Sequence, residues 1–69
     1  MILIANRLKQ ARLMKNLTQE ELAKQVGVTK GAIGNYETGV SFPKLPIFLK
    51  LLSVLQVDAN FIFQDYIRN

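Results

Sequence analysis

Residues 17–39 constrain the fold more strongly than any other part of the chain, because they encode two short helices on either side of one tight turn. Thr18 can cap the first helix, and Glu21, three residues later, can accept a hydrogen bond from the Thr18 N–H, which makes a capping box. Gly27 stands where a helix commonly ends in a left-handed residue. Thr29 can then cap a second helix. The local sequence therefore predicts a helix, a sharp turn and another helix.

Each of these two helices also carries an apolar pair that can face a common core. A spacing of three or four residues places both members of a pair on one helix face, and the pairs are Leu22 with Val26 and Ile33 with Tyr36. Ala23 is small enough to lie where the two helices cross closely, and Gly39 is expected to end the second helix. This is the arrangement of a helix-turn-helix unit, whose second helix enters the major groove of DNA. Other small helical proteins can show the same succession of cap, apolar pair, glycine and cap, so the spacing by itself leaves both interpretations open.

Apolar periodicity predicts three further helices around this unit. They cover residues 2–15, 45–55 and 59–67, which together with 19–25 and 30–38 give an all-α chain of five helices.

The segment 45–55 carries two apolar stripes at helical spacing. The stripe expected to face the core holds Leu45, Phe48, Leu52 and Leu55, and the second holds Ile47, Leu51 and Val54. A helix that is apolar on nearly all sides is expected to be buried on nearly all sides. Phe42, in the loop before it, is expected to fold inward.

Length and composition limit the chain to a single small domain over residues 1–69, which buries only about 60% of its unfolded surface. Because the chain has no cysteine and no histidine, neither a disulfide nor a metal site of these residues can stabilise it. Hydrophobic residues make up 49% of the chain, so a second copy is expected to cover part of the apolar surface. We expect a cytoplasmic protein without a membrane span, since residues 1–5 are too short for either a signal peptide or a span.

The positive charge is concentrated in the first part of the chain. The formal net charge is +4, but residues 1–50 hold eight basic and three acidic residues, a net charge of +5, and residues 51–69 have a net charge of −1. A basic part and a nearly neutral, apolar part suit a nucleic-acid face and an association face. Solvated lysines without a binding role are also common in small basic domains, so charge by itself leaves both interpretations open.

The residue types do not favour catalysis. Histidine and cysteine are absent, and Ser41 and Ser53 have no base near them in the sequence. Caps and ion pairs account for the few carboxylates. Gly31 and Gly34 fall inside a predicted helix, whereas a phosphate-binding loop lies between a strand and a helix. We therefore expect a protein that is not an enzyme and that holds neither a cofactor nor a metal.

Several motifs in order along the chain resemble the DNA-binding domain of the phage repressor and Cro family of bacterial regulators, the XRE type. The matching residues are Leu17 to Ala23, Gly27 to Thr29, Ile33, Tyr36, Glu37, Gly39 and Pro43, with Arg12 before them and residues 55–57 after them. The resemblance covers roughly residues 4–63. It implies a five-helix lambda-repressor-like fold and a sequence-specific DNA-binding regulator, expected to be a repressor that binds a two-fold symmetric operator as a homodimer.

The resemblance implies roles for four residues outside the base-reading surface. Arg12 is expected to pair with Glu37 and so to tie the first helix to the third; the alternative is a solvated arginine that touches phosphate. Gln19 is expected to contact a DNA phosphate at the start of the second helix. Lys44 is expected to lie against the DNA backbone, although lysine is a poor helix cap at that position.

Three residues of the third helix can read bases by their chemistry. Lys30 can donate to guanine O6 and N7, Asn35 can bond to adenine N6 and N7, and Thr29 can divide its hydroxyl between capping and DNA. Gly31 and Gly34 stand where many relatives carry longer polar side chains. Either they allow a close approach to the bases, or base contacts are sparse and recognition depends on phosphates and DNA shape.

The segment 59–67 is expected to begin at the cap Asp58 and to contribute to association between two copies. Aromatic side chains are too numerous there for so small a core, so Asp58, Ala59 and Phe61 are expected at a dimer contact. The apolar surface of the last two helices also allows a second interpretation. In that interpretation the chain is a protein-interaction module of the same fold, such as an antitoxin-like or sigma-factor-binding partner.

Overall fold

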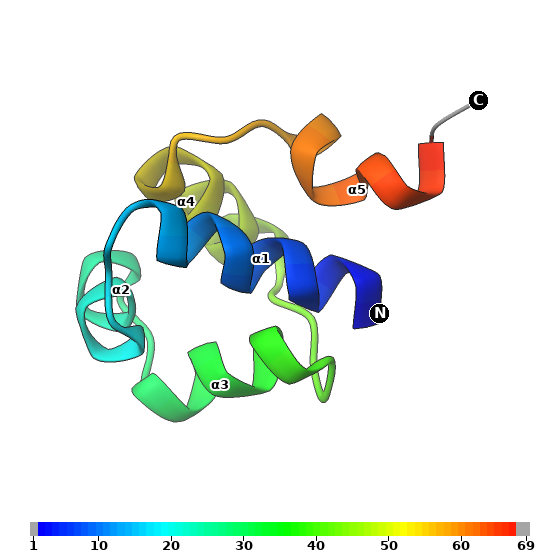
Figure 1. Ribbon diagram of the computed structural model, residues 1–69. Coiled ribbons are helices and arrows are strands. Elements are labelled where there is room, and N and C mark those ends of the chain that lie inside the picture. The colour runs from blue at the N-terminus through cyan, green and yellow to red at the C-terminus, as the bar shows by residue number, and fades with distance from the viewer. Residues whose placement is uncertain (1, 68–69) are drawn as a thin grey trace.

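A computed structural model of the chain describes residues 2–67, and its five α-helices confirm the all-α prediction (Figure 1). The helices are α1 (Ile2–Met14), α2 (Gln19–Val26), α3 (Lys30–Thr38), α4 (Leu45–Leu55) and α5 (Ala59–Ile67). The last three have the predicted bounds, whereas α1 ends one residue earlier and α2 one residue later than predicted. The predicted domain also includes residues 1, 68 and 69, which lie outside the described part.

Short-range hydrogen bonds fix the ends of α2 and α3 as the sequence predicts. Thr18 Oγ1 accepts from the Glu21 N–H at 3.0 Å, and Glu21 Oε1 accepts from the Thr18 N–H at 2.8 Å, which completes the capping box. Thr29 Oγ1 accepts from the Ala32 N–H at 3.0 Å. Gly27 and Gly39 have φ of 84° and 81°, the left-handed conformation that glycine adopts without a steric penalty.

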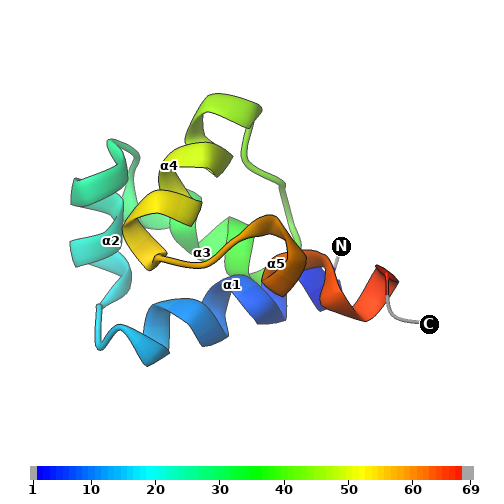
Figure 2. The same ribbon diagram turned by 90° about the horizontal axis from the view of Figure 1, so that it is seen from above.

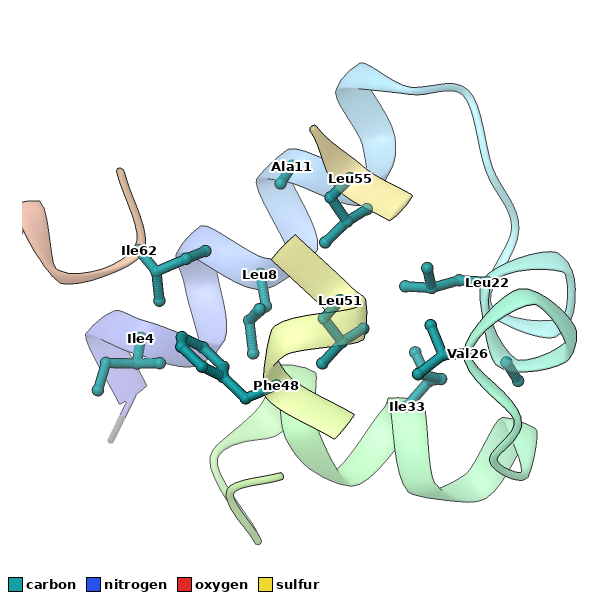
Figure 3. Packing of buried hydrophobic residues seen from close by; sticks show 11 residues of the cluster. Ile4, Leu8, Ala11, Leu22, Val26, Ile33, Phe48, Leu51, Leu55 and Ile62 are labelled. Atoms are coloured by element: carbon teal, nitrogen blue, oxygen red, sulfur yellow. The ribbon is translucent and has the colours of Figure 1, made fainter. Parts of the chain in front are cut away.

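All five helices contribute to one apolar core (Figure 3). α1 packs against α3 and α5, and α2 packs against α3 and α4. Figure 2 shows α5 lying beside the N-terminal half of α1. The buried cluster consists of Ile4, Leu8, Ala11, Leu22, Ala23, Val26, Ile33, Phe48, Leu51, Leu55 and Ile62. Because α1 and α2 both pack against α3 through this cluster, the core holds α3 from one side and leaves its other side to solvent.

The expectation that α4 is buried on nearly all sides is wrong. Its core side is formed by Phe48, Leu51 and Leu55, whereas Leu45 is 66% exposed and Leu49 is 55% exposed. A chain of this length has no further layer with which to cover the opposite face of α4. Leu45 therefore belongs to the surface, and Leu51 replaces it in the core.

The prediction that Phe42 folds inward is also wrong, since its side chain is 38% exposed. Pro43 is the buried residue of this loop. Phe42 lies along the surface of the core, with its ring centroid 5.3 Å from that of Phe48, and Phe48 in turn lies 5.8 Å from Phe63. This row of three rings connects the loop to α4 and α5.

Two helices end at left-handed residues that are not glycine. Asn16 after α1 has φ of 58°, and Gln56 after α4 has φ of 57°. Asparagine tolerates this conformation better than most residues. The side chain of Gln56 accepts a hydrogen bond from Lys15 Nζ, which links the end of α4 to the end of α1.

The longest helix of the described part, α1, has 13 residues, whereas a membrane-spanning helix needs about 20. Within residues 2–67 no single helix is both long and apolar enough to cross a bilayer; α4 and α5 meet the criterion by length and composition only when taken together, across a bend of 106°.

Candidate nucleic-acid interface

The inner and outer sides of α3 differ sharply in exposure. Ile33 is 1% exposed and faces the core, and Glu37 is buried beside it. Lys30 and Asn35, the two predicted base-reading side chains, are exposed to solvent. Thr29 is exposed at the N-cap, where its oxygen accepts from the Ala32 N–H and its O–H remains able to donate. The structure thus brings all three predicted base-reading residues to the solvent side of one short helix.

The turn between α2 and α3 sets the angle at which α3 leaves α2. Ala23 is 3% exposed, and its carbonyl accepts from both the Gly27 N–H at 2.8 Å and the Val28 N–H at 3.0 Å. The second bond requires Gly27 to be left-handed, and glycine adopts that conformation at little steric cost. A backbone-to-backbone constraint of this kind fixes the direction of α3 before any side chain of α3 is considered.

A buried ion pair joins α3 to α1. Arg12 Nε lies 2.7 Å from Glu37 Oε2, and Arg12 Nη2 lies 3.0 Å from Glu37 Oε1, so the guanidinium and the carboxylate meet through two parallel bonds. The two residues are 7% and 5% exposed. Arg12 Nη1 also donates to the Leu17 carbonyl at 2.7 Å. Arg12 is therefore not a solvated side chain that is free to touch phosphate, and it holds α1, α3 and the end of the α1–α2 turn together.

Gln19 belongs to the same polar network, a contact that the sequence analysis missed. Its Nε2 donates to Glu37 Oε1 at 3.1 Å, and its side chain is half-buried. Residues 19 and 37 lie on different helices, and no sequence spacing indicates their contact. Gln19, which is expected to contact phosphate, and Arg12, which is expected to form the structural pair, thus both donate to the Glu37 carboxylate.

A groove of about 630 Å³ opens where the α1–α2 turn meets the starts of α2 and α3, and its walls include Thr18, Gln19 and Lys30. The N–H groups of residues 19 and 20 have no acceptor inside α2, because a helix leaves its first amides unpaired. Together with the dipole of the helix they favour an anion at this end. The groove therefore combines backbone donors, the Gln19 amide and the Lys30 ammonium with one acidic residue, Glu20.

Lys44 lies at the other edge of the surface, at the N-cap of α4. Its side chain is exposed and makes no capping hydrogen bond, while its carbonyl accepts from the Phe48 N–H at 2.8 Å. The prediction that lysine is a poor cap here agrees with this geometry. The ammonium group remains in solvent beside the loop that follows α3.

The residues expected at a dimer contact lie at the start of α5. Asp58 Oδ1 accepts from the Phe61 N–H at 2.9 Å, so Asp58 caps this helix as predicted, and Asp58 and Ala59 are exposed. Phe61 is half-buried, since the guanidinium carbon of Arg7 lies 5.2 Å from its ring centroid. The first helix of the same chain thus covers part of Phe61.

Arg7 holds α5 against α1 through a second ion pair that the sequence analysis missed. Its Nε and Nη2 lie 3.1 and 3.2 Å from the two carboxylate oxygens of Asp65. The hydrogen bond to Asp65 raises the pKa of the Arg7 guanidinium above its usual range. The two residues are 58 positions apart, a separation at which no local pattern indicates pairing.

Comparisons with known proteins agree with this geometry. Residues 8–62 match the family model described as "Helix-turn-helix". An uncharacterised HTH-type transcriptional regulator of Methanocaldococcus jannaschii is 37% identical over 62 residues, which cover 87% of this chain and 94% of that protein. The antitoxin HipB of Escherichia coli is 35% identical over 57 residues, which cover 83% of this chain.

A solved structure is also similar over nearly the whole chain. The restriction-modification controller protein C.AhdI from Aeromonas hydrophila has a TM-score of 0.83 and 31% identity, with 90% of this chain and 94% of that chain covered. In contrast, the chain spans only 57 to 65% of the length of three other curated relatives, HipB among them.

Proposed function

The chain belongs to the helix-turn-helix family of DNA-binding transcriptional regulators, and from this premise we propose that it is a repressor that binds a two-fold symmetric operator as a homodimer. Each copy inserts α3 into the major groove, and occupation of the operator blocks transcription. The two copies of α3 enter successive major grooves roughly 34 Å apart on one face of the duplex. The protein then acts in the cytoplasm, where the DNA is.

The single observation that carries this proposal is the exposure of Lys30 and Asn35 on a helix whose other side is buried. Lys30 donates to guanine, and Asn35 bonds to adenine through its amide. Thr29 adds a hydroxyl at the end of α3 that enters the groove first. Glu37 and Ile33 hold the helix from behind, so the three side chains keep a fixed spacing.

Gln19 and Lys44 contact the DNA backbone on either side of α3. Both lie near exposed helix starts, Gln19 at α2 and Lys44 at α4. Their contacts to phosphate position the helix without reading sequence. Asp58, Ala59 and Phe61 form the contact between the two copies, at the end of the molecule where α5 begins.

Selection of bound sequences from a random duplex pool tests the proposal directly. A consensus with two-fold symmetry is expected, with half-sites one helical turn apart. Lys30→Ala and Asn35→Ala should each lose about 1–3 kcal/mol of discrimination at one base pair of that consensus. Fluorescence anisotropy with single-base variants of the duplex measures this loss.

Lys50→Ala is the matched control, because Lys50 is an exposed lysine in the middle of α4 and does not belong to the proposed base-reading residues. It removes the same charge and should leave base discrimination unchanged. If neither Lys30→Ala nor Asn35→Ala changes discrimination at any base pair, the assignment of α3 as the reading helix is wrong.

A second candidate function is a protein-interaction module of antitoxin type. The observation that favours it is the similarity to the antitoxin HipB, together with the exposed leucines of α4, Leu45 and Leu49. In this alternative a protein partner binds the apolar surface of α4. Tight binding of a purified toxin-like partner, combined with no salt-dependent affinity for duplex DNA, would favour it over the repressor.

A further inference from the structure

We propose that Glu37 is a positioning residue for Gln19, so that the buried carboxylate orients a DNA-backbone contact on α2 as well as bracing α3. This inference rests on the proposed function, since it concerns how the protein holds DNA. It assigns to the Arg12–Glu37 pair a role in binding that is separate from its role in stability.

The carboxylate of Glu37 accepts three hydrogen bonds from two other elements. Arg12 Nε donates to Oε2 at 2.7 Å, Arg12 Nη2 donates to Oε1 at 3.0 Å, and Gln19 Nε2 donates to Oε1 at 3.1 Å. The guanidinium is itself held by the Leu17 carbonyl at 2.7 Å. The carboxylate therefore cannot rotate without breaking bonds to Arg12, and it presents Oε1 to Gln19 in one orientation.

This bond determines where the rest of the Gln19 amide points. A primary amide has two N–H donors and a carbonyl with two lone pairs. One N–H is used by Glu37, and the other N–H and the carbonyl remain for a ligand. An exposed glutamine must lose side-chain conformational entropy when it binds. Because Gln19 is already restrained, it loses less of this entropy when it donates to a phosphate.

The surroundings of the amide suit a phosphate. Gln19 lines the same groove as Lys30, next to the unpaired backbone amides at the start of α2. A Cβ built on Gly34 would lie in ordinary van der Waals contact with Gln19 Nε2, at 4.0 Å, so the backbone of α3 passes close to the amide. Since Glu37 belongs to α3, the donor on α2 keeps a fixed position relative to the base-reading side chains.

A double-mutant cycle on DNA binding tests the inference with the full chain. Gln19→Ala is expected to weaken binding to the selected duplex about tenfold, the loss of one hydrogen bond to a charged group. A background that carries Arg12→Met together with Glu37→Leu removes both acceptor oxygens and the buried guanidinium at once, so Gln19 loses its restraint and no unpaired charge is left behind. In this background, Gln19→Ala is therefore expected to weaken binding less than about twofold. If the two losses simply multiply, Glu37 does not act through Gln19 and the inference is wrong.

A measurement on the unaltered protein keeps the inference testable even if the variant with Arg12→Met and Glu37→Leu does not fold. The side-chain amide of Gln19 should be ordered in the DNA-free protein, with an NMR order parameter near 0.8, whereas an exposed glutamine should fall below about 0.6. Gln25 is the matched control, because it lies exposed on the same helix. An order parameter for Gln19 as low as that of Gln25 would overturn the inference.

The two levels of the proposal fail in different ways. If the unaltered chain shows no salt-dependent binding to any duplex in the pool, the repressor function is wrong and the positioning role falls with it. If the unaltered chain binds but the cycle shows no coupling, only the positioning role is wrong.

Discussion

The segment from α2 to α3 and the segment from α4 to α5 are similar in length, but different kinds of interaction hold them in place. Directional hydrogen bonds hold the first. It has a capping box at Thr18, a second N-cap at Thr29, two left-handed glycines and the network around Glu37. Each of these interactions fixes a particular angle or distance.

The polar contacts of the second segment, the Asp58 cap and the Arg7–Asp65 pair, are partly exposed, and its buried contacts are apolar. α4 begins at Lys44 without a side-chain cap and ends at the left-handed Gln56. Two of its leucines are exposed, and a row of aromatic rings links it to the preceding loop and to α5. Apolar contacts are not directional, so they hold this segment with looser geometry than the hydrogen bonds hold α2 and α3.

This difference indicates which helices must be positioned accurately for the proposed function. Base edges accept hydrogen bonds only within narrow limits of distance and angle, so the helix that carries Lys30 and Asn35 has to keep a fixed direction. For the association that we propose, the surface of α4 and α5 only has to remain apolar and accessible.

Removal of the buried ion pair is expected to give the largest difference in the free energy of unfolding between the two segments. Arg12→Ala leaves the Glu37 carboxylate buried without its main partner and should lower the free energy of unfolding by about 3–5 kcal/mol. Arg7→Ala removes the corresponding pair on α5, where the side chains of Arg7 and Asp65 are 20% and 32% exposed. Solvent screens that pair, so its loss should be much smaller. Urea unfolding of both variants measures the difference, and equal losses would contradict the contrast.

A double variant provides the control for the size of this effect. Arg12→Met combined with Glu37→Leu removes both charges at once, and it should recover most of the stability lost in Arg12→Ala. If the double variant is as unstable as the single variant, the loss comes from packing and not from an uncompensated charge.

The two segments also differ in how much of them the sequence predicts. The bounds of α3, the capping box at Thr18 and the left-handed conformation of Gly27 follow from signals within a few residues, so they could be predicted. The contacts of Gln19 with Glu37 and of Arg7 with Asp65 could not, because they join residues that only the tertiary fold brings together. The Arg12–Glu37 pair was expected from a resemblance to a family and not from spacing.

The buried side of α4 shows a second limit of prediction. Its sequence is apolar on two faces, so periodicity allows either Leu45 or Leu51 to face the core. The choice depends on where α1, α2 and α5 lie, which no local pattern contains. Truncation of one leucine on each face of α4 tests which face lies in the core, and its expected effect on the free energy of unfolding is the next largest.

Leu51→Ala and Leu49→Ala compare the two faces of α4 by the same change. Leu51 is 2% exposed and Leu49 is 55% exposed. Truncation of the buried leucine should lower the free energy of unfolding by about 2–5 kcal/mol, because it removes apolar contacts and leaves a cavity. Truncation of the exposed leucine should change it by about 0.5 kcal/mol or less. A large loss for Leu49→Ala, with the chain shown to be monomeric by sedimentation, would mean that both faces are covered.

Gly34→Ala tests one of the two glycines inside α3, which weaken the α2–α3 segment through their low helix propensity. A Cβ at this position would meet only Gln19 Nε2, at 4.0 Å, which is an ordinary contact. The substitution should therefore raise the free energy of unfolding by about 1 kcal/mol, through helix propensity. Gly39→Ala is the control, since its φ of 81° is unfavourable for alanine, and it should lower stability.

DNA binding of the same Gly34→Ala variant decides between the two interpretations of the glycines. If the duplex approaches α3 closely, the more stable variant should bind DNA more weakly. If base contacts are sparse at this position, affinity should not change. Thermal unfolding measures the stability of the variant, and fluorescence anisotropy on the same preparation measures its affinity for the duplex.

The smallest expected effect concerns the start of α4, where the missing cap distinguishes the second segment from the first. Lys44→Ser supplies a side-chain oxygen at the N-cap and should raise the free energy of unfolding by about 0.5–1 kcal/mol. It also removes an exposed positive charge, so DNA affinity should fall for all sequences alike, and the slope of log K against log salt should decrease by about one. Thr18→Ala, which removes an existing cap, should shift stability in the opposite direction by a similar amount. A gain in stability with unchanged salt dependence would show that Lys44 does not contact the DNA backbone, and the missing cap would then need another explanation.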